Sequence, residues 1–105
     1  MVKSTKRLMA AALCVAAAGA HAQSTPIDPL QVRVWAASCA ACHGTAGRAQ
    51  PGMASLAGRS AAELTRLMMD FKADRKPATV MHQLAKGFSD EQIQQISAYF
   101  AAQPK

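Results

Sequence analysis

Apolar residues recur at helical spacing in three segments of the chain, which begin at Asp28, Ser60 and Ser89. In each segment they fall three or four positions apart, as on a helix that buries one face. These stripes consist of Leu30, Val34 and Ala37 in the first segment, of Leu64, Leu67, Met68 and Phe71 in the second, and of Ile93, Ile96 and Phe100 in the third. Because no segment alternates apolar and polar residues as a half-buried strand does, the pattern predicts an all-α fold.

The residues that open the three segments support this prediction. Each segment begins with an Asp or Ser and carries a Gln or Glu three positions later, which is the arrangement of a capping box. The pairs are Asp28 with Gln31, Ser60 with Glu63, and Ser89 with Gln92. Glycines and prolines interrupt residues 44–59 and 74–88, so we expect two loops there, the second around a short helical turn. Long irregular loops in so small a domain normally surround a bound group.

The N-terminus has the composition of a secretory signal. Lys3, Lys6 and Arg7 precede an apolar run, and Ala20 and Ala22 then form the A-x-A pattern of a cleavage site. We therefore expect residues 1–22 to be removed and residues 23–105 to form one periplasmic domain. The apolar run is too short to span a bilayer, so no stable membrane insertion is expected.

Removal of this segment would lower the net positive charge of the chain. The chain has 12 Lys and Arg against 6 Asp and Glu, a net charge of +6, and three of those basic residues lie in residues 1–22. The remaining excess of +3 is too small to predict a nucleic-acid partner.

The motif that carries chemistry is Cys39-Ala40-Ala41-Cys42-His43, that is, C-x-x-C-H. Two thiols at this spacing can form thioethers with the two vinyl groups of haem, and the adjacent histidine can then bind the iron. One such motif predicts one covalently bound haem c. The haem would also supply an apolar centre for a domain whose own core is thin.

Two other chemistries use the same residue types. A thioredoxin-like pair needs a βαβ context, which the pattern does not provide. A structural zinc site needs four ligands, and the predicted mature chain could offer Cys39, Cys42, His43 and His82. The direct succession of Cys42 and His43 does not suit a zinc knuckle, so haem is favoured.

The second axial ligand must come from further along the chain. The candidates are Met53, Met68, Met69, Met81 and His82. Met81 is favoured because we expect it in the loop before the last helix, where it can cross the distal face of the haem. His82 is the main alternative, and we expect it to face solvent beside the ligand. Methionine coordination would give a higher potential than a second histidine.

The quoted motif, together with Gly44-Thr-Ala-Gly47, Ser55-Leu-Ala-Gly58 and the segment from Met81 to Phe100, resembles class I bacterial cytochromes c. The resemblance implies that the first and last helices cross and that the haem lies in a crevice. In relatives, a proline often stands near the carbonyl that accepts the N–H of the proximal histidine. Here Ala54 stands at that position, and the sequence leaves open which carbonyl is the acceptor.

Residues 70–81 and 84–90 further resemble the cytochrome subunit of flavocytochrome c sulfide dehydrogenases and domains of dihaem periplasmic cytochromes. This resemblance implies redox protein partners, among them a flavoprotein that oxidises sulfide. The protein is expected to be an electron carrier and no enzyme by itself. A diffusible carrier to a terminal oxidase or reductase is the alternative, and a haem enzyme or sensor with an open distal site is a third hypothesis. Four cations near Met81 could orient an acidic partner, namely Lys72, Arg75, Lys76 and Lys86.

Overall fold

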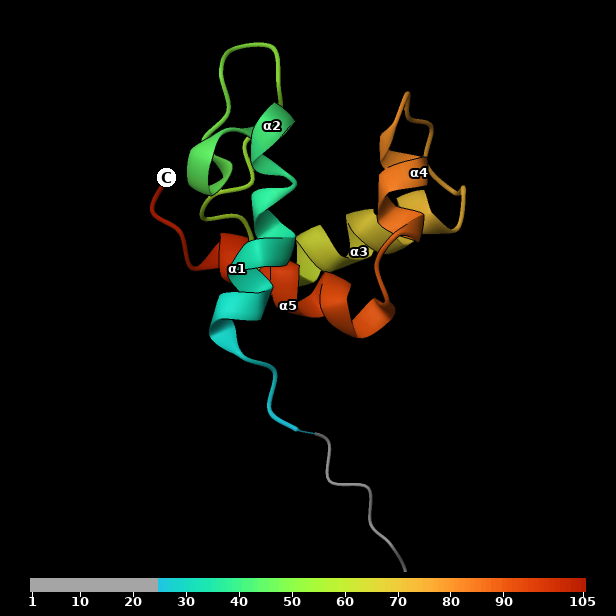
Figure 1. Cartoon of the computed structure of the whole chain (residues 1–105). Coiled ribbons are helices and arrows are strands. Elements are labelled where there is room, and N and C mark those ends of the chain that lie inside the picture. Colours follow the sequence, from blue (N-terminus) through green and yellow to red (C-terminus); the bar gives the residue numbers. More distant parts are fainter. Residues whose placement is uncertain (1–24) are drawn as a thin grey trace, which may run out of the picture.

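Three helices form the base of the molecule: α1 (Pro29–Ala37), α3 (Ala61–Lys72) and α5 (Asp90–Ala101). The computed structural model describes residues 25–105, so the predicted signal, residues 1–22, lies outside the described residues. Helix α5 packs against both α1 and α3 (Figure 1). Since residues 25–105 contain no strand, the predicted all-α fold and the predicted contact between first and last helix are confirmed.

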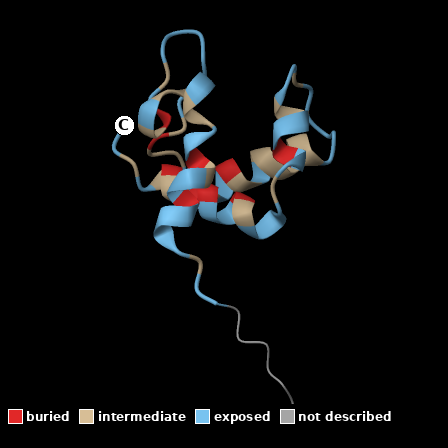
Figure 2. Ribbon diagram, in the orientation of Figure 1, coloured by how far each residue is buried: buried red, intermediate tan, exposed pale blue. Residues whose placement is uncertain are grey.

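Two arms rise from the same side of this base, at opposite ends of it (Figure 1). The α2 arm, residues 39–58, contains the short helix α2 (Ala40–His43) and the 3-10 turn η1 (Thr45–Gly47). The α4 arm, residues 73–88, contains α4 (Met81–Lys86), which packs against α3. Buried residues gather in the base and at the foot of each arm, whereas the outer loops are exposed (Figure 2).

Side-chain caps explain where the three base helices begin. The Ser89 hydroxyl accepts from Gln92 N–H at 3.1 Å and the Gln92 side chain accepts from Ser89 N–H at 2.8 Å, so the predicted capping box is complete. At α3 the Ser60 hydroxyl accepts from Glu63 N–H, but the Glu63 carboxylate pairs with Arg59 instead of returning to Ser60. At α1 the Asp28 carboxylate accepts from Leu30 N–H at 2.9 Å.

The buried residues confirm the stripe predicted for α5 and correct the one predicted for α1. Ile93, Ile96 and Phe100 are all at most 3% exposed. On α1, however, Leu30 and Val34 are each 64% exposed, while Val32 and Ala36 are buried.

The reason for this correction is that α1 carries two apolar faces. Val32, Trp35, Ala36 and Cys39 also follow helical spacing, and this face holds the large indole. Trp35 and Cys39 pack against the cluster of buried residues that joins α1, α3 and α5, and Leu64 is the member contributed by α3. The face with the larger side chain is the one that is buried.

Candidate haem site

The two cysteines lie one turn apart on the α2 arm. The chain bends after α1, where Cys39 N–H donates to Ala36 O at 3.0 Å, and α2 then begins at the next residue. Positions three apart on a helix share one face, so both thiols lie on the same side of α2. Cys39 is half-buried and Cys42 is exposed, and neither forms a disulfide. Burial raises the pKa of the Cys39 thiol, and a hydrogen bond with Ser38 lowers it by less.

The imidazole of His43 is held by a backbone carbonyl. Its Nδ1 lies 2.6 Å from Ala54 O. A carbonyl oxygen can only accept, so Nδ1 carries a proton, and in the neutral imidazole Nε2 then offers its lone pair, as a metal ligand requires. Ala54 itself is therefore the acceptor that the sequence left open.

The loop that carries Ala54 is tied back to the start of the arm. Leu56 N–H donates to Gly47 O at 2.8 Å, and Ala49 N–H donates to Ser55 Oγ at 2.9 Å. These bonds fix the distance between His43 and the segment that orients it.

Two glycines make this close packing possible. Gly44 follows the motif directly and has φ +79°, and a Cβ placed on it would lie 1.9 Å from Arg48 O. Gly47 also has φ +79°, and its Cβ would lie 2.8 Å from the Phe100 ring of α5. Any side chain at these positions would push the α2 arm off its own turn or off the base.

Met81 lies on the other arm; the short helical turn expected within residues 74–88 is confirmed, but Met81 belongs to this turn and not to the loop before it. It is the first residue of α4, whose first turn closes when Gln83 N–H and Leu84 N–H donate to Val80 O. Ala85, which is 0% exposed, packs this helix onto α3. The Met81 side chain is half-buried and belongs to the first turn of this helix.

The other candidates for the second ligand are distributed over the molecule. Met53 is 47% exposed in the α2 arm, on the same arm as His43. Met68 and Met69 are half-buried within α3. His82 was expected to face solvent, but it is half-buried, and its Nδ1 is buried without a hydrogen-bond partner. Met81 and His82 are consecutive residues of α4, and both are half-buried.

The cations near Met81 are less free than the sequence suggested. Lys72 Nζ donates to Phe88 O at 2.7 Å and to Asp90 at 2.8 Å. Arg75 pairs with Asp70 at 2.9 Å and Lys86 with Asp74 at 2.8 Å. Lys76 lies 5.9 Å from the centre of the Phe71 ring. Three of these four cations are therefore each paired with a carboxylate, which reduces the positive charge they present to a partner.

The competing chemistries find no support in this geometry. Residues 25–105 contain no group of three or more His, Cys, Asp or Glu side chains that could hold a metal ion, so Cys39, Cys42, His43 and His82 do not form a zinc site there. A thioredoxin-like context also needs strands, and the described part of the chain has none.

The donor set fits a covalently bound haem instead. The α2 arm offers two free thiols on one face and an imidazole whose second nitrogen is already engaged. The α4 arm offers a thioether, which is a soft ligand suited to iron in a cytochrome. Both arms also expose large apolar side chains: Met53 on one, and Val80 and Leu84, each 52% exposed, on the other.

An all-helical base, two facing arms and a C-x-x-C-H helix define a c-type cytochrome of class I. Residues 31–100 match the family described as cytochrome c oxidase, cbb3-type, subunit III. The chain belongs to this family of haem c proteins, and it is an electron carrier.

Three relatives show how far the similarity extends. The chain is 35% identical over 71% of its length to the cytochrome subunit of sulfide dehydrogenase from Chlorobaculum tepidum, of which the match covers 68%. It is 38% identical to cytochrome c4 from Pseudomonas aeruginosa over 65% of this chain, and 36% identical to cytochrome c-554(548) from Halomonas halodenitrificans over 63%. The match spans 34% of the cytochrome c4 and 84% of the c-554(548).

No helix within residues 25–105 is long and apolar enough to cross a membrane.

Proposed function

We propose that residues 23–105 form an exported domain that carries one haem c and passes single electrons between protein partners. Cys39 and Cys42 attach the haem, and His43 and Met81 ligate its iron. Residues 1–22 are the cleaved signal, which delivers the chain to the periplasm, where the thioethers form. The haem supplies the one-electron Fe(II)/Fe(III) couple.

The hydrogen bond between His43 Nδ1 and Ala54 O carries this proposal. A histidine in a C-x-x-C-H motif needs its Nδ1 engaged so that Nε2 is presented to iron in one tautomer and one orientation. The 2.6 Å contact meets that requirement within residues 25–105 alone. Because the acceptor belongs to a loop tied to η1, the folded α2 arm holds the imidazole in one orientation.

Met81 supports the proposal from the opposite arm. A thioether stabilises ferrous iron relative to a second imidazole, so Met81 raises the reduction potential and favours accepting electrons. Met53 is a weaker candidate because it shares an arm with His43, and the two axial ligands must approach the iron from opposite faces. His82 is the main alternative ligand, so the assignment of Met81 must be tested against it.

The partner we propose is a flavoprotein that oxidises sulfide. This rests on the relative named cytochrome subunit of sulfide dehydrogenase, of which the match covers 68%. In that role the cytochrome accepts electrons and performs no bond-making chemistry, so it is no enzyme by itself. The alternative is a diffusible carrier; the relative of which the match covers 84% is named only as a cytochrome, c-554(548), and not as a subunit.

Substitution of Met81 tests the ligand assignment. Met81→Ala should leave the haem covalently attached, because attachment depends on Cys39 and Cys42. It should abolish the thioether-to-iron charge-transfer band of the ferric protein and lower the reduction potential. Absorption spectra and potentiometric titration measure both effects. His82→Ala and Met53→Ala are the matched controls; if either abolished the band while Met81→Ala kept it, the assignment would be wrong.

Gentle purification tests the partner. The native cytochrome, isolated from the periplasmic fraction at low salt, should co-elute with a protein that carries flavin absorbance and reduces the haem when sulfide is added. A cytochrome that elutes alone, and that remains oxidised when sulfide is added to the fraction, is the result expected of the diffusible carrier.

A further inference from the structure

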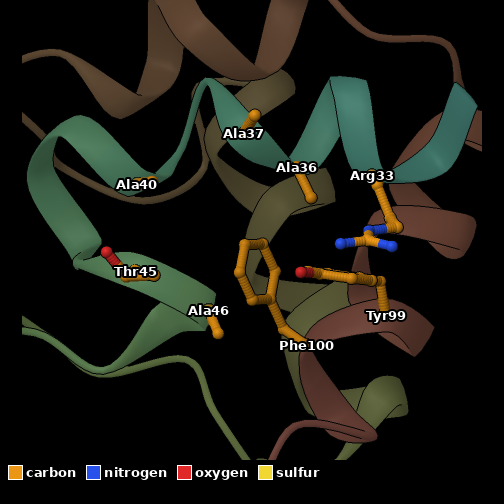
Figure 3. A pocket seen from close by; sticks show the side chains of 8 residues that line it. All are labelled: Arg33, Ala36, Ala37, Ala40, Thr45, Ala46, Tyr99 and Phe100. Carbon is orange, nitrogen blue, oxygen red and sulfur yellow. The ribbon is translucent and has the colours of Figure 1, made fainter. Parts of the chain in front are cut away.

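A groove follows the crossing of α1 and α5, apart from the proposed haem ligands. It consists of two hollows, of about 210 Å³ and 280 Å³, that meet at one pair of side chains. Arg33 of α1 and Tyr99 of α5 line both hollows. Figure 3 shows the Arg33 guanidinium beside the Tyr99 ring, with Phe100 and the alanines of α1 forming the neighbouring wall.

The lining of the groove is apolar apart from a few polar groups. Ile27, Pro29 and Val32 contribute to the larger hollow, and Phe100 with four alanines contributes to the smaller one. A concave apolar surface with a single cation at its middle is suited to a ligand that is apolar at both ends and negative between them.

The charge of Arg33 has no counterpart in the described part of the chain. Arg59, Arg66 and Arg75 each pair with a carboxylate, and so do Lys72 and Lys86. For Arg33, no carboxylate of residues 25–105 lies within ion-pair distance, and its side chain is exposed. A guanidinium beside a phenol presents several donors to a carboxylate in a fixed geometry, and the partly apolar walls reduce the competition from water.

The groove also reaches the proposed attachment site. Ala40, which lies between Cys39 and Cys42 in the sequence, lines the smaller hollow. A chain bound in the groove would therefore lie next to the helix that carries both thiols. Leu30 and Val34, each 64% exposed, lie on α1, the helix that carries Arg33.

We propose that this groove docks a protein partner through a segment in which one Asp or Glu is flanked by apolar residues. The carboxylate binds Arg33 with the Tyr99 hydroxyl nearby, and the apolar residues on either side fill the two hollows. That this partner is a redox partner rests on the proposed function. The ligand is a peptide segment rather than a nucleic acid, because a phosphate backbone would require a row of cations and the groove offers one.

A defined peptide tests the proposal. The probe is the blocked heptapeptide Gly-Ala-Leu-Glu-Leu-Ala-Gly, titrated into ¹⁵N-labelled, reduced holoprotein at low salt, with the Gln-for-Glu peptide as its control. We expect amide shifts centred on Arg33, Ala36 and Tyr99, and weaker binding of the Gln peptide. Arg33→Gln should weaken binding of the Glu peptide about fivefold, the loss of one exposed charged contact. Arg48→Gln is the matched control, because Arg48 is also exposed and bonds only a backbone carbonyl, that of Pro104.

Three results would overturn the proposal: equal shifts with both peptides, shifts centred outside the groove, or binding unchanged by Arg33→Gln. Groove shifts that follow dilution of the protein without peptide would show instead that a second copy of this chain occupies the groove. None of these outcomes depends on the axial ligand, which the spectrum of Met81→Ala tests separately.

Discussion

The two arms are held in place by different forces. In the α2 arm the contacts are mainly hydrogen bonds to backbone carbonyls and close packing: His43 Nδ1 to Ala54 O, Leu56 N–H to Gly47 O, and Gly47 packed on Phe100. In the α4 arm charged side chains take part in the contacts: Lys86 pairs with Asp74, Arg75 pairs with Asp70 of α3, and Lys72 of α3 donates to Phe88 O. The α4 arm has one fully buried residue, Ala85, at its foot.

The two arms should therefore respond differently to salt and to pH. Neutral hydrogen bonds and close van der Waals contacts change little with salt, whereas exposed ion pairs are weakened by salt and by protonation of the carboxylate. We therefore expect the α2 arm to be the more rigid one, which suits the proposed attachment of haem at two points. The α4 arm can adjust its position at low cost.

Loss of both thiols is the largest change that this comparison predicts. Cys39→Ser with Cys42→Ser should prevent haem attachment and leave the domain largely unfolded, because the described core is confined to the base and the arms have little buried surface. Circular dichroism and haem staining of the purified protein measure both effects.

Met81→Ala serves as the control for this pair of substitutions, since it should keep the haem and the fold. A double Cys variant that unfolded cooperatively without haem would show that the base is stable alone, and that neither arm depends on the haem.

A smaller effect is expected when the turn of the rigid arm is disturbed. Gly44→Ala places a Cβ 1.9 Å from Arg48 O at φ +79°, so the backbone must move, and we expect a loss of more than about 3 kcal/mol in unfolding free energy. Gly52→Ala is a matched control within the same arm, because Gly52 has φ +92° but nothing lies within 4 Å of its Cβ.

The control should cost about 1–2 kcal/mol, the penalty of a left-handed residue alone. Denaturant unfolding of the oxidised holoproteins measures the difference. Equal losses in the two variants would mean that the α2 arm is not closely packed at Gly44, and the proposed contrast between the arms would fail.

The parts of the fold that the sequence predicted are those encoded by neighbours along the chain. Ser89 and Gln92 make a complete capping box from four consecutive positions, and Ile93, Ile96 and Phe100 then follow one helical face. The haem motif is equally local. Such features need no knowledge of what the helix packs against.

The predictions that proved wrong concern features that depend on residues distant in the sequence. On α1 both faces are apolar, and only the packing of Trp35 against the base decides that Leu30 and Val34 stay outside. Helix α4 begins at Met81 after Val80, which makes no side-chain cap, so no local signal marks its start.

The charges near Met81 show the same limitation. In the sequence these residues form a basic cluster, but folding brings Asp74 of the arm to Lys86 and Asp90 of α5 to Lys72. Likewise, the contact of His43 with Ala54 depends on the positive φ angles of Gly44 and Gly47, which reverse the chain between the two residues.

The smallest predicted effect concerns the ion pair of the α4 arm. A hydrogen bond from Lys86, which makes the largest contribution, lowers the pKa of Asp74 below 3.8. A carboxyl with a lowered folded-state pKa stabilises the fold above its unfolded pKa, and this contribution disappears as the pH falls through the folded-state value. Asp74→Asn should therefore lower Tm by a few degrees at most at pH 7, and by progressively less as the pH falls through the folded-state pKa.

Asn is the appropriate substitution because Asp74 has φ +56°, a conformation that Asn also tolerates. Thermal melts of wild type and Asp74→Asn at pH 7 and pH 3, each at low and high salt, measure the effect. The difference in Tm should shrink at high salt as well as at low pH. Gly52→Ala is again the control, because a neutral backbone penalty in the α2 arm should not depend on either condition. A difference for Asp74→Asn that persisted in acid and in salt would mean that the carboxylate acts through its backbone position, and the α4 arm would then be held as the α2 arm is.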